Sequence, residues 1–511
     1  MLQSDNPEFK FRLARLEKWR AAGTDPFGAR IEALMSATAA RSLHTAETPH
    51  DGGPSAKVAG RITLLRDIGK LIFITISDWT GKIQVGLAKQ FLTARWDQAK
   101  LLELGDIAWF SGKLGHTKTG EITIWADDFG LASKSLLPPP EKFHGLADTE
   151  SRYRQRYLDL AANADSLDVF LTRSRIMSSI REFLAARQFV EVETPMMQAI
   201  PGGAAARPFV THHNALDIDL FLRISPELFL KQLLVGGMER VYEINRNFRN
   251  EGIDTSHNPE FTMMELYQAY SDLAGMMELT ETLLASLAAT RHAVIHATAT
   301  PAPGIKLPYG DRMIDFTPPF QRVSYSDLFL EHVGVPMTDH AAVQQRALEH
   351  GLAEVDKTNH GVLAGILFER LAEPKLTEYG QPVFVYDYPA GLCPLTKRKA
   401  GMPHLAERFE LYIAGMELAN AYTELNDPFL QYETFSAQLA GLKEEDSMAR
   451  MDHDFIAALC HGMPPAGGLG IGIDRLVMVL ANRTSIRDVV LFPLLKSRGA
   501  TGTSPVPAQE T

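Results

Sequence analysis

Two carboxylates in one predicted hairpin, Glu410 and Glu417, are spaced for metal or phosphate chemistry. If Ala414 and Gly415 form a two-residue turn, Tyr412 pairs with Glu417 across the hairpin, and Glu410 lies diagonally from Glu417 on the same face. Carboxylates so placed repel each other unless a cation lies between them. Magnesium is the natural candidate, because it binds through one or two carboxylates together with phosphate oxygens. An exposed acidic strand is the alternative.

A second hairpin, predicted over residues 239–267, combines an arginine with an aromatic ring. Alternation with a period of two places the polar side chains of the first strand, up to Arg249, on one face, opposite an apolar face that packs. On the second strand, Phe261, Glu265 and Tyr267 share one face. A bidentate guanidinium suits a phosphate that gains charge in a transition state, and an aromatic face suits a purine. A surface hairpin with a solvated face is the alternative.

A glycine-rich stretch, GGLGIGIDRLVMVLAN at residues 467–482, leads into an apolar helical pattern. Taken alone, three glycines at alternate positions are a weak signal. They do not form a dinucleotide fingerprint, because the third glycine comes one residue early.

These segments resemble the three signature motifs of the class II aminoacyl-tRNA synthetases, and they are most similar to the lysyl branch. The second motif is matched by Phe-Arg-x-Glu at 248–251 and His-Asn-Pro-Glu-Phe at 257–261. The first is matched by a helix predicted over 166–188 with a strand after it, and the third by the glycine-rich stretch. The motifs occur in order, and the resemblance covers about residues 8–496. It implies an α+β multidomain fold in which an OB-fold β-barrel precedes an antiparallel-sheet catalytic domain with a helical insertion.

The resemblance also implies a reaction and a set of ATP contacts. Lysine would react with ATP to give lysyl-adenylate, and lysine tRNA would then receive the lysyl group. Arg249 would hold the α-phosphate and the amino-acid carboxylate, and Arg475 the γ-phosphate. The remaining ATP contacts would come from Glu251 and Asn258 at the adenine end, His257 at the outer phosphates and Phe261 on the base. Magnesium would bind at Glu410 and Glu417.

For lysine itself, the resemblance implies contacts to both ammonium groups and to the carboxylate. The α-amino group would meet Gly203 and Glu227, the carboxylate Asn420, the aliphatic stem Tyr422, and the ε-ammonium Glu424 with Tyr267 and Glu265. A buried ammonium requires a carboxylate and further acceptors, because an unpaired buried charge is costly. Asn420, Tyr422 and Glu424 differ in parity from Glu417, so one pocket requires a bulge or bend in that strand.

Five short strand patterns between residues 58 and 134 predict a small Greek-key barrel of the OB-fold type. Such barrels stack and pair single-stranded bases. The region is similar to the anticodon-binding domain of lysyl enzymes, which implies that Phe73 stacks on an anticodon base while Arg66 and Gln84 bind base edges. The alternative for Phe73 is a place in the barrel core.

The remaining segments frame these two domains. Residues 1–57 are expected to hold a basic helix at 6–22, either solvated or in contact with RNA, and a loop. The barrel domain is assigned to 58–146 and the catalytic domain to 147–496, with a proline-rich linker from Pro138 at the boundary. A helical insertion is expected at about 271–375 and a disordered tail at 497–511.

Composition limits the classes of function. The 511 residues are 45% apolar, enough for the cores of two or three domains, and the net charge of −11 disfavours nucleic-acid binding by overall charge. No run approaches the roughly 18 apolar residues of a membrane span, and no secretory leader is recognised. The two cysteines lack metal-ligand spacing, which disfavours structural zinc and indicates a reducing compartment, the cytoplasm. A homodimer is expected from the resemblance alone.

Two departures and three alternatives qualify this interpretation. Residues 391–395 read Gly-Leu-Cys-Pro-Leu where Glu-Val-Ser-Pro-Leu is expected, and Tyr422 stands where phenylalanine is common. A protein-lysylating relative is disfavoured, because such relatives usually lack the barrel. An aspartyl or asparaginyl enzyme would place a cation where Glu424 offers an anion. A noncatalytic RNA-binding paralogue would have lost motif residues such as Arg249 and Arg475, which this chain keeps.

Overall fold

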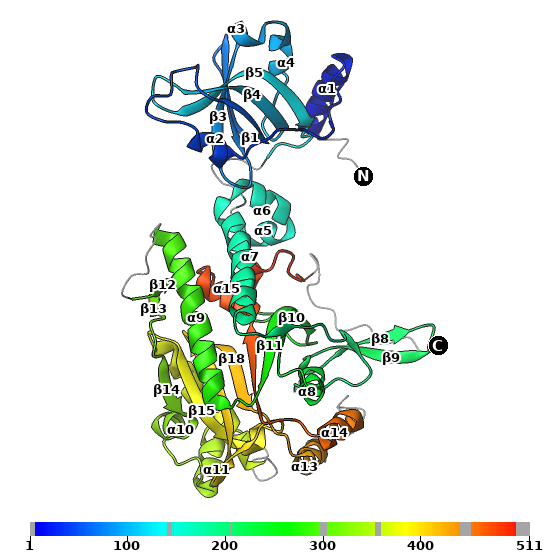
Figure 1. Ribbon diagram of the computed structural model, residues 1–511, viewed down its shortest axis with the longest axis vertical. Coiled ribbons are helices and arrows are strands. Elements are labelled where there is room, and N and C mark those ends of the chain that lie inside the picture. Colours follow the sequence, from blue (N-terminus) through cyan, green and yellow to red (C-terminus); the bar gives the residue numbers. More distant parts are fainter. Residues whose placement is uncertain are drawn as a thin grey trace. The chain divides into compact units, whose positions relative to one another are not determined.

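The computed structural model describes residues 6–139, 146, 148–204, 206–296, 304–352, 359–439 and 451–496 (Figure 1). The predicted tail at 497–511 lies outside the described residues, as do most of the linker after Pro138 and part of the proline-rich stretch near 301. The chain forms two compact units, Met1–Leu167 and Asp168–Thr511.

The first unit is built on a closed five-stranded barrel, which confirms the predicted OB-fold. Its strands are β1 (Ser55–Asp67), β2 (Leu71–Ser77), β3 (Lys82–Ala88), β4 (Ile107–His116) and β5 (Ile122–Ser133), paired in the order β1-β2-β3-β5-β4. Alternate residues fill its interior, as Ile72, Ile74 and Ile76 do on β2. Short helices α3 (Lys89–Leu92) and α4 (Trp96–Ala99) connect β3 to β4.

The predicted N-terminal helix is α1 (Pro7–Ala21), which begins where the Asn6 side chain accepts hydrogen bonds from the first free amides. The short helix α2 (Ala37–Ser42) follows before the barrel. On α1, Arg12 is buried and donates to the carbonyl oxygens of Leu104 and Ser135, and Arg15 donates to that of Lys100. These two basic side chains therefore attach the helix to the barrel, which leaves the other three basic residues on its exposed face.

The second unit contains a nine-stranded, mostly antiparallel sheet, as expected for a class II catalytic domain (Figure 1). Its strand order is β14-β15-β17-β18-β19-β11-β10-β6, and β16 pairs with β17. The bounds are β6 (Val190–Glu191), β10 (Arg240–Phe248), β11 (Glu260–Ala269), β14 (Gln321–Ser324), β15 (Val383–Pro389), β16 (Arg398–Lys399), β17 (Met402–Ile413), β18 (Met416–Thr423) and β19 (Ala466–Gly472). A two-stranded sheet pairs β12 (Lys306–Tyr309) with β13 (Arg312–Asp315). A three-stranded sheet has β9 (Ile218–Leu222) in the middle, between β7 (Met197–Gln198) and β8 (Phe209–His213).

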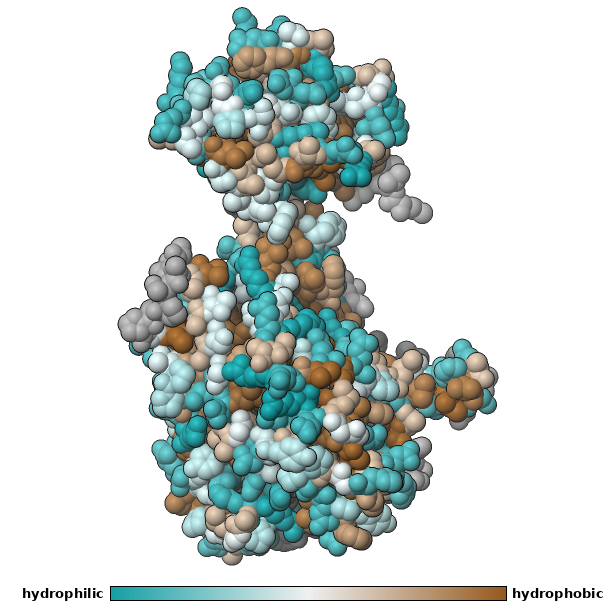
Figure 2. Space-filling view, in the orientation of Figure 1, coloured by the Kyte–Doolittle hydropathy of each residue, from teal (hydrophilic) through white to brown (hydrophobic). Residues whose placement is uncertain are grey.

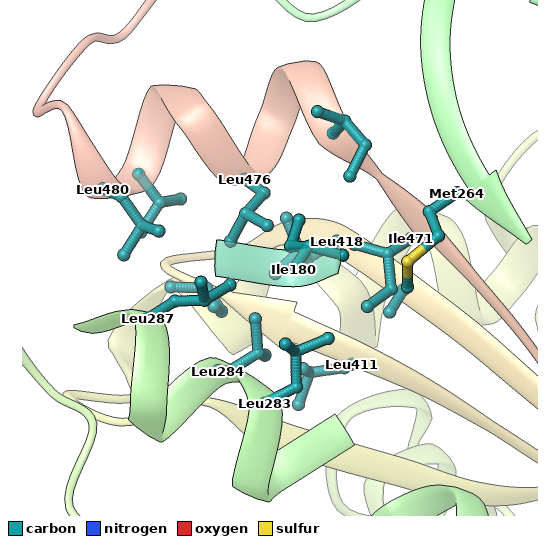
Figure 3. Packing of buried hydrophobic residues seen from close by; sticks show 14 of the residues in the cluster. Ile180, Met264, Leu283, Leu284, Leu287, Leu411, Leu418, Ile471, Leu476 and Leu480 are labelled. Atoms are coloured by element: carbon teal, nitrogen blue, oxygen red, sulfur yellow. The ribbon is translucent and has the colours of Figure 1, made fainter. Parts of the chain in front are cut away.

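Helices cover one face of this sheet. The apolar side chains of α9 (Leu273–His296) and α15 (Ile473–Leu480) pack against Leu411, Leu418 and Ile471 of the strands (Figure 3). The helix predicted at 166–188 is α7 (Ala164–Ala185), whose Ile180 joins the same core. Because side chains alternate along each strand, the residues between these core positions point to the opposite face. That opposite face holds the candidate site.

The segment expected to be a helical insertion contains more than helices. Helices α10 (Tyr325–Val333), α11 (His340–Glu349) and α12 (His360–Leu367) lie within it, but so do the β12–β13 hairpin and β14, an edge strand of the main sheet. Helix α9 starts the segment, yet it packs on the sheet as part of the catalytic core. The other helices of the chain are α5 (Thr149–Arg154), α6 (Arg156–Ala162), α8 (Glu227–Val235), α13 (Pro428–Leu439), α14 (His453–Cys460) and α16 (Ile486–Val489).

Candidate active site

Two cross-strand rows on the open face of the sheet form the floor of the site. In the first, which we call the Glu265 row, Glu410 pairs with Asn420, Asn420 with Gly470, and Gly470 with Glu265. In the second, the Tyr267 row, the corresponding order is Arg408, Tyr422, Gly468 and Tyr267. Glycine occupies the middle of each row, on β19, so each row has polar side chains on both sides of a gap.

The bulge required by the parity of β18 is present. Ala414 and Gly415 form the predicted turn with positive φ angles of 52° and 80°, and Tyr412 pairs with Glu417. The register then shifts, because Leu411 pairs with Ala419, and Leu418 is the additional residue. This shift places Asn420, and with it Tyr422 and Glu424, on the same face of the sheet as Glu417.

A pocket of about 200 Å³ is lined by the two middle residues of the Glu265 row, Asn420 and Gly470. It brings together all six residues assigned to ATP, namely Arg249, Glu251, His257, Asn258, Phe261 and Arg475, with Glu417 and Asn420 beside them. These residues come from three segments that are far apart in the sequence. The pocket therefore joins the second and third motifs in one concave surface.

Arg249 has unused hydrogen-bonding capacity in this pocket. Its guanidinium lies 5.1 Å from the centre of the Phe261 ring, and its Nε is buried with no acceptor among the described residues. The Oδ1 of Asn258 is also buried without a donor in that part of the chain. Buried polar groups without partners are costly, so both atoms favour a polar ligand.

Arg475 lies at the outer end of the pocket and is held from two sides. It donates to the backbone oxygen of Glu417 at 2.6 Å, and its other terminal nitrogen is 3.0 Å from Nε2 of His257. The Nδ1 of His257 is in turn 2.8 Å from a carboxylate oxygen of Asp254. These contacts orient a guanidinium and an imidazole toward the same end of the pocket.

The two predicted magnesium ligands lie in different environments. Glu417 is half-buried and lines the pocket, and burial followed by the nearby Glu410 charge raises its pKa. Glu410 accepts hydrogen bonds from Tyr388 at 2.7 Å, Tyr412 at 2.6 Å and Arg408. Within the described ranges, no group of three or more His, Cys, Asp or Glu is placed to hold a metal ion. The pair therefore fits magnesium only as a hard-oxygen donor set that phosphate oxygens complete.

The residues assigned to the amino acid form a second, deeper cluster. Glu227, Glu265 and Glu424 are buried, and Ser225 and Tyr267 donate to Glu265 at 2.8 and 3.1 Å. Gly203 adjoins them, with a φ of +82° and a backbone so close that an added Cβ would lie 2.9 Å from Glu227. This cluster lies where Glu265 and the Tyr267 row meet, adjacent to the pocket that holds the six residues assigned to ATP, which we call the ATP pocket.

Lys231, which the sequence interpretation missed, is the counter-ion of this cluster. Its ammonium lies 2.6 Å from Glu227 and 2.5 Å from Glu424, and the side chain is fully buried. Burial alone would lower the pKa of Lys231, but the charges of Glu227 and Glu424 raise it. The spacing of Glu227 and Lys231 on helix α8 is i, i+4, which places them on one face and was readable in the sequence.

The two departures from the family pattern lie in different places. Gly391 is exposed, and its nearest neighbour is Asn359 at the start of α12, so the lost carboxylate lies outside the amino-acid cluster. Cys393 is buried with its sulfur 3.5 Å from Arg408, and the guanidinium of Arg408 lies over the Tyr422 ring at 5.5 Å. Of the departures, therefore, Tyr422 lies in the Tyr267 row, Cys393 lies beside that row, and Gly391 lies away from it.

The three residues assigned to the anticodon lie on the outer face of the barrel. Phe73 pairs with Arg66 and contacts the Trp125 ring at 6.0 Å, and Gln84 donates to Thr123 at 2.8 Å. The alternative that Phe73 fills the barrel core is excluded, because its neighbours Ile72 and Ile74 point inward. Beside Trp125 lies a groove of about 640 Å³ that is lined by His50, Asp51, Lys70, Leu71, Ala88, Lys89, Gln90, Phe91 and Trp125.

Comparisons with known proteins agree with both domains. Residues 148–496 match the family of class II tRNA synthetases for D, K and N, and residues 56–131 match the OB-fold nucleic acid binding domain. The lysine–tRNA ligase of Pelotomaculum thermopropionicum is 48% identical over 500 residues, which cover 96% of each chain. That of Bacillus subtilis is 44% identical over 501 residues, covering 96% of this chain and 98% of the relative. The chain therefore belongs to the lysine–tRNA ligase family of the class II aminoacyl-tRNA synthetases.

Proposed function

We propose that this enzyme activates L-lysine as lysyl-adenylate and transfers the lysyl group to lysine tRNA. Family membership supports ATP-dependent attachment of lysine to tRNA. The observation that carries the finer proposal is the charge of the deep cluster, where three carboxylates, Glu227, Glu265 and Glu424, are buried with one cation, Lys231, which pairs with the first and the last of them. Such a cluster lacks positive charge, and a substrate with two ammonium groups supplies it.

In the first step, the lysine carboxylate attacks the α-phosphorus of ATP, and the bond to the β-phosphate oxygen breaks to release pyrophosphate. Arg249 lies at the junction of the two sites and contacts the α-phosphate and the attacking carboxylate. Arg475 and His257 bind the outer phosphates. No protein nucleophile is required, because rate enhancement comes from positioning and from stabilising the charge that develops on phosphate oxygens.

Magnesium, when bound, neutralises phosphate charge, and Glu417 with Glu410 would hold it. The residues around them have separate tasks. Phe261 stacks on the adenine, Glu251 and Asn258 meet its polar edge, and Asn420 holds the lysine carboxylate near the α-phosphate. In the second step, the terminal ribose hydroxyl of the tRNA attacks the adenylate carbonyl carbon, and AMP leaves.

The first experiment is ATP–pyrophosphate exchange with each of the twenty amino acids, followed by charging of total tRNA. Exchange with lysine and charging of lysine tRNA alone are the expected results. Lysine exchange without charging would favour a protein-lysylating enzyme. Exchange with aspartate or asparagine would overturn the assignment of Glu424, and no exchange with any amino acid would favour a noncatalytic paralogue.

We expect kcat/KM for lysine to rise by about tenfold or more between pH 6 and pH 8. Burial and the Glu227 charge raise the pKa of Glu265 to about 7, and burial raises that of Glu424 to about 8. Both carboxyl groups are neutral below these values and bind ammonium only when ionised, so activity increases with pH. The measurement is the pH profile of exchange at limiting lysine. A profile that is flat or falls over this range would contradict the assignment, and Glu424→Gln should show a shallower rise.

We expect Phe73→Ala to lower kcat/KM for tRNA charging by about 10- to 100-fold, because stacking on one base is worth about 1–3 kcal/mol. Exchange without tRNA should stay within twofold, since Phe73 lies on the barrel. The matched control is Phe27→Ala, which removes an exposed ring next to the end of β5. Equal losses for both variants would argue against a stacking role for Phe73.

We also propose that the enzyme is a homodimer in the cytoplasm. Exposed hydrophobic side chains lie along the β8–β9 hairpin, with Val210 near its base and Leu216 and Ile218 at its turn, and Figure 2 shows hydrophobic surface on this hairpin. Val190 of β6, after the helix of the first motif, is half-exposed as well. Among the described helices, none is long and apolar enough to cross a membrane. Sedimentation at micromolar concentration tests the dimer, and a monomer alone would contradict it.

A further inference from the structure

Lys231 connects two residues that the proposed function assigns to opposite ends of the substrate. Glu227 begins helix α8 and is assigned to the α-amino group, while Glu424 follows β18 and is assigned to the ε-ammonium. One ammonium, that of Lys231, contacts both carboxylates at 2.6 and 2.5 Å. The three residues are buried, so these contacts are shielded from water and salt.

We propose that Lys231 is a positioning residue that sets the distance between the α-amino and ε-ammonium subsites, and thereby selects the length of the substrate side chain. This inference rests on the proposed function of Glu227 and Glu424. Without Lys231, two buried carboxylates would repel each other and no cation would hold them at a fixed separation. With it, Oε2 of Glu424 lies 2.5 Å from the Lys231 ammonium, and neither carboxylate oxygen of Glu424 accepts a well-aligned hydrogen bond from any residue that the structure describes. Oε1, the oxygen farther from Lys231, is the one left for the substrate.

The surroundings of this bridge are rigid, which is necessary for a residue that defines a distance. Lys231 lies one helical turn after Glu227, so the helix backbone fixes their relative positions. Glu424 is held by its amide, which donates to the Ala466 oxygen at 2.8 Å. Shape selection by apolar contacts alone distinguishes one methylene by only about 10- to 200-fold in kcat/KM. Two carboxylates at a fixed separation increase this discrimination, because a substrate with a shorter side chain leaves one of them without an ammonium partner.

The test compares lysine with ornithine, which is one methylene shorter, in ATP–pyrophosphate exchange. The variants are Lys231→Met, which removes the cation, and Lys231→Arg, which keeps the charge on a longer and wider group. The matched control is Lys375→Met, which removes an exposed lysine in the second unit. Thermal unfolding of each variant without substrates checks its folding.

We expect Lys231→Met to raise the lysine KM at least tenfold and to reduce the ratio of kcat/KM for lysine over ornithine at least tenfold. Lys231→Arg should retain more lysine exchange than the methionine variant but also lose part of that ratio. The rise of activity with pH should move to higher pH in Lys231→Met, because Lys231 opposes the effect of burial on the pKa of Glu424. The other charged groups that act on Glu424 are Glu227 and Glu265, and both raise its pKa, as burial does.

A purely structural role gives a different result. It would lower exchange with lysine and ornithine equally, and a wild-type ratio in the folded methionine variant would overturn the proposal. If that variant does not fold, a wild-type ratio in Lys231→Arg has the same consequence. Failure of the wild-type protein to exchange with lysine would instead overturn the proposed function, so the two failures are distinguishable.

Discussion

Replacing Arg249 by alanine is expected to lower lysine-dependent ATP–pyrophosphate exchange by about 10³-fold or more, the range in which a single arginine acts on a phosphoryl transition state. The guanidinium has a buried Nε without an acceptor among the described residues, and it stands where the ATP pocket meets the carboxylate cluster. Under the proposed function, its loss would remove contacts to both the attacking carboxylate and the α-phosphate. The effect should appear mainly in kcat, because the charge it stabilises develops in the transition state.

The matched control is Arg246→Ala on β10, the strand that ends just before Arg249. Arg246 is at the opposite parity, so its side chain points to the other face of β10, where it pairs with Glu260 at 3.6 Å. This variant should keep exchange within a few fold. Near-normal exchange in a folded Arg249→Ala protein would refute the assignment of both substrates to this face.

The second large effect is expected for Gly468→Ala. An added Cβ would lie 1.9 Å from Oε1 of Glu424 and 2.6 Å from the Tyr267 ring, so both side chains must move. We expect the lysine KM to rise about 100-fold, since a displacement of about 1 Å costs that much in well-oriented sites. The ATP KM should change little, because Gly468 does not line the ATP pocket.

A glycine four residues later on the chain serves as the comparison. In Gly472→Ala the nearest atom to the new Cβ would be the Leu418 oxygen at 3.7 Å, an ordinary contact. Its lysine KM should stay within about threefold of the wild type, because nothing in the carboxylate cluster has to move. A similar rise in lysine KM for both variants would indicate a general disturbance of β19 and count against the specific clash.

The resemblance to the class II motifs supplied the candidate site residues, and local rules predicted how several of them are placed. Period-two alternation predicted the faces of Arg249 and Phe261, the turn at Ala414 set the pairing of Tyr412 with Glu417, and parity required the bulge that the structure shows. These inferences use only neighbouring residues and strand geometry. The barrel was predictable for the same reason, since its strands alternate regularly.

Other features depend on tertiary context that no local pattern contains. The sequence predicted that one face of β10 is polar. It did not predict that Glu243 and Asn247 on that face are nearly inaccessible to water. Lys231 has a readable spacing from Glu227, but its second partner, Glu424, is almost 200 residues away in the sequence. Strand β14 has four residues, which is too short for a periodic signal, and only its pairing with β15 makes it a strand. Burial and long-range pairing are what the sequence could not supply.

The Glu265 row borders both substrate sites, which has a consequence for inhibitors. Asn420 and Gly470 line the ATP pocket, and Glu265 in the same row belongs to the amino-acid cluster. The two sites therefore share a wall formed by hydrogen-bonded strands of the sheet. Strand geometry separates neighbouring rows by about 6.7 Å, and the residues of both rows lie on strands that the sheet holds in place. A single bisubstrate molecule that joins a purine to a lysine would therefore meet a preformed surface. Its affinity would carry little of the entropic cost that ordering a flexible lid imposes.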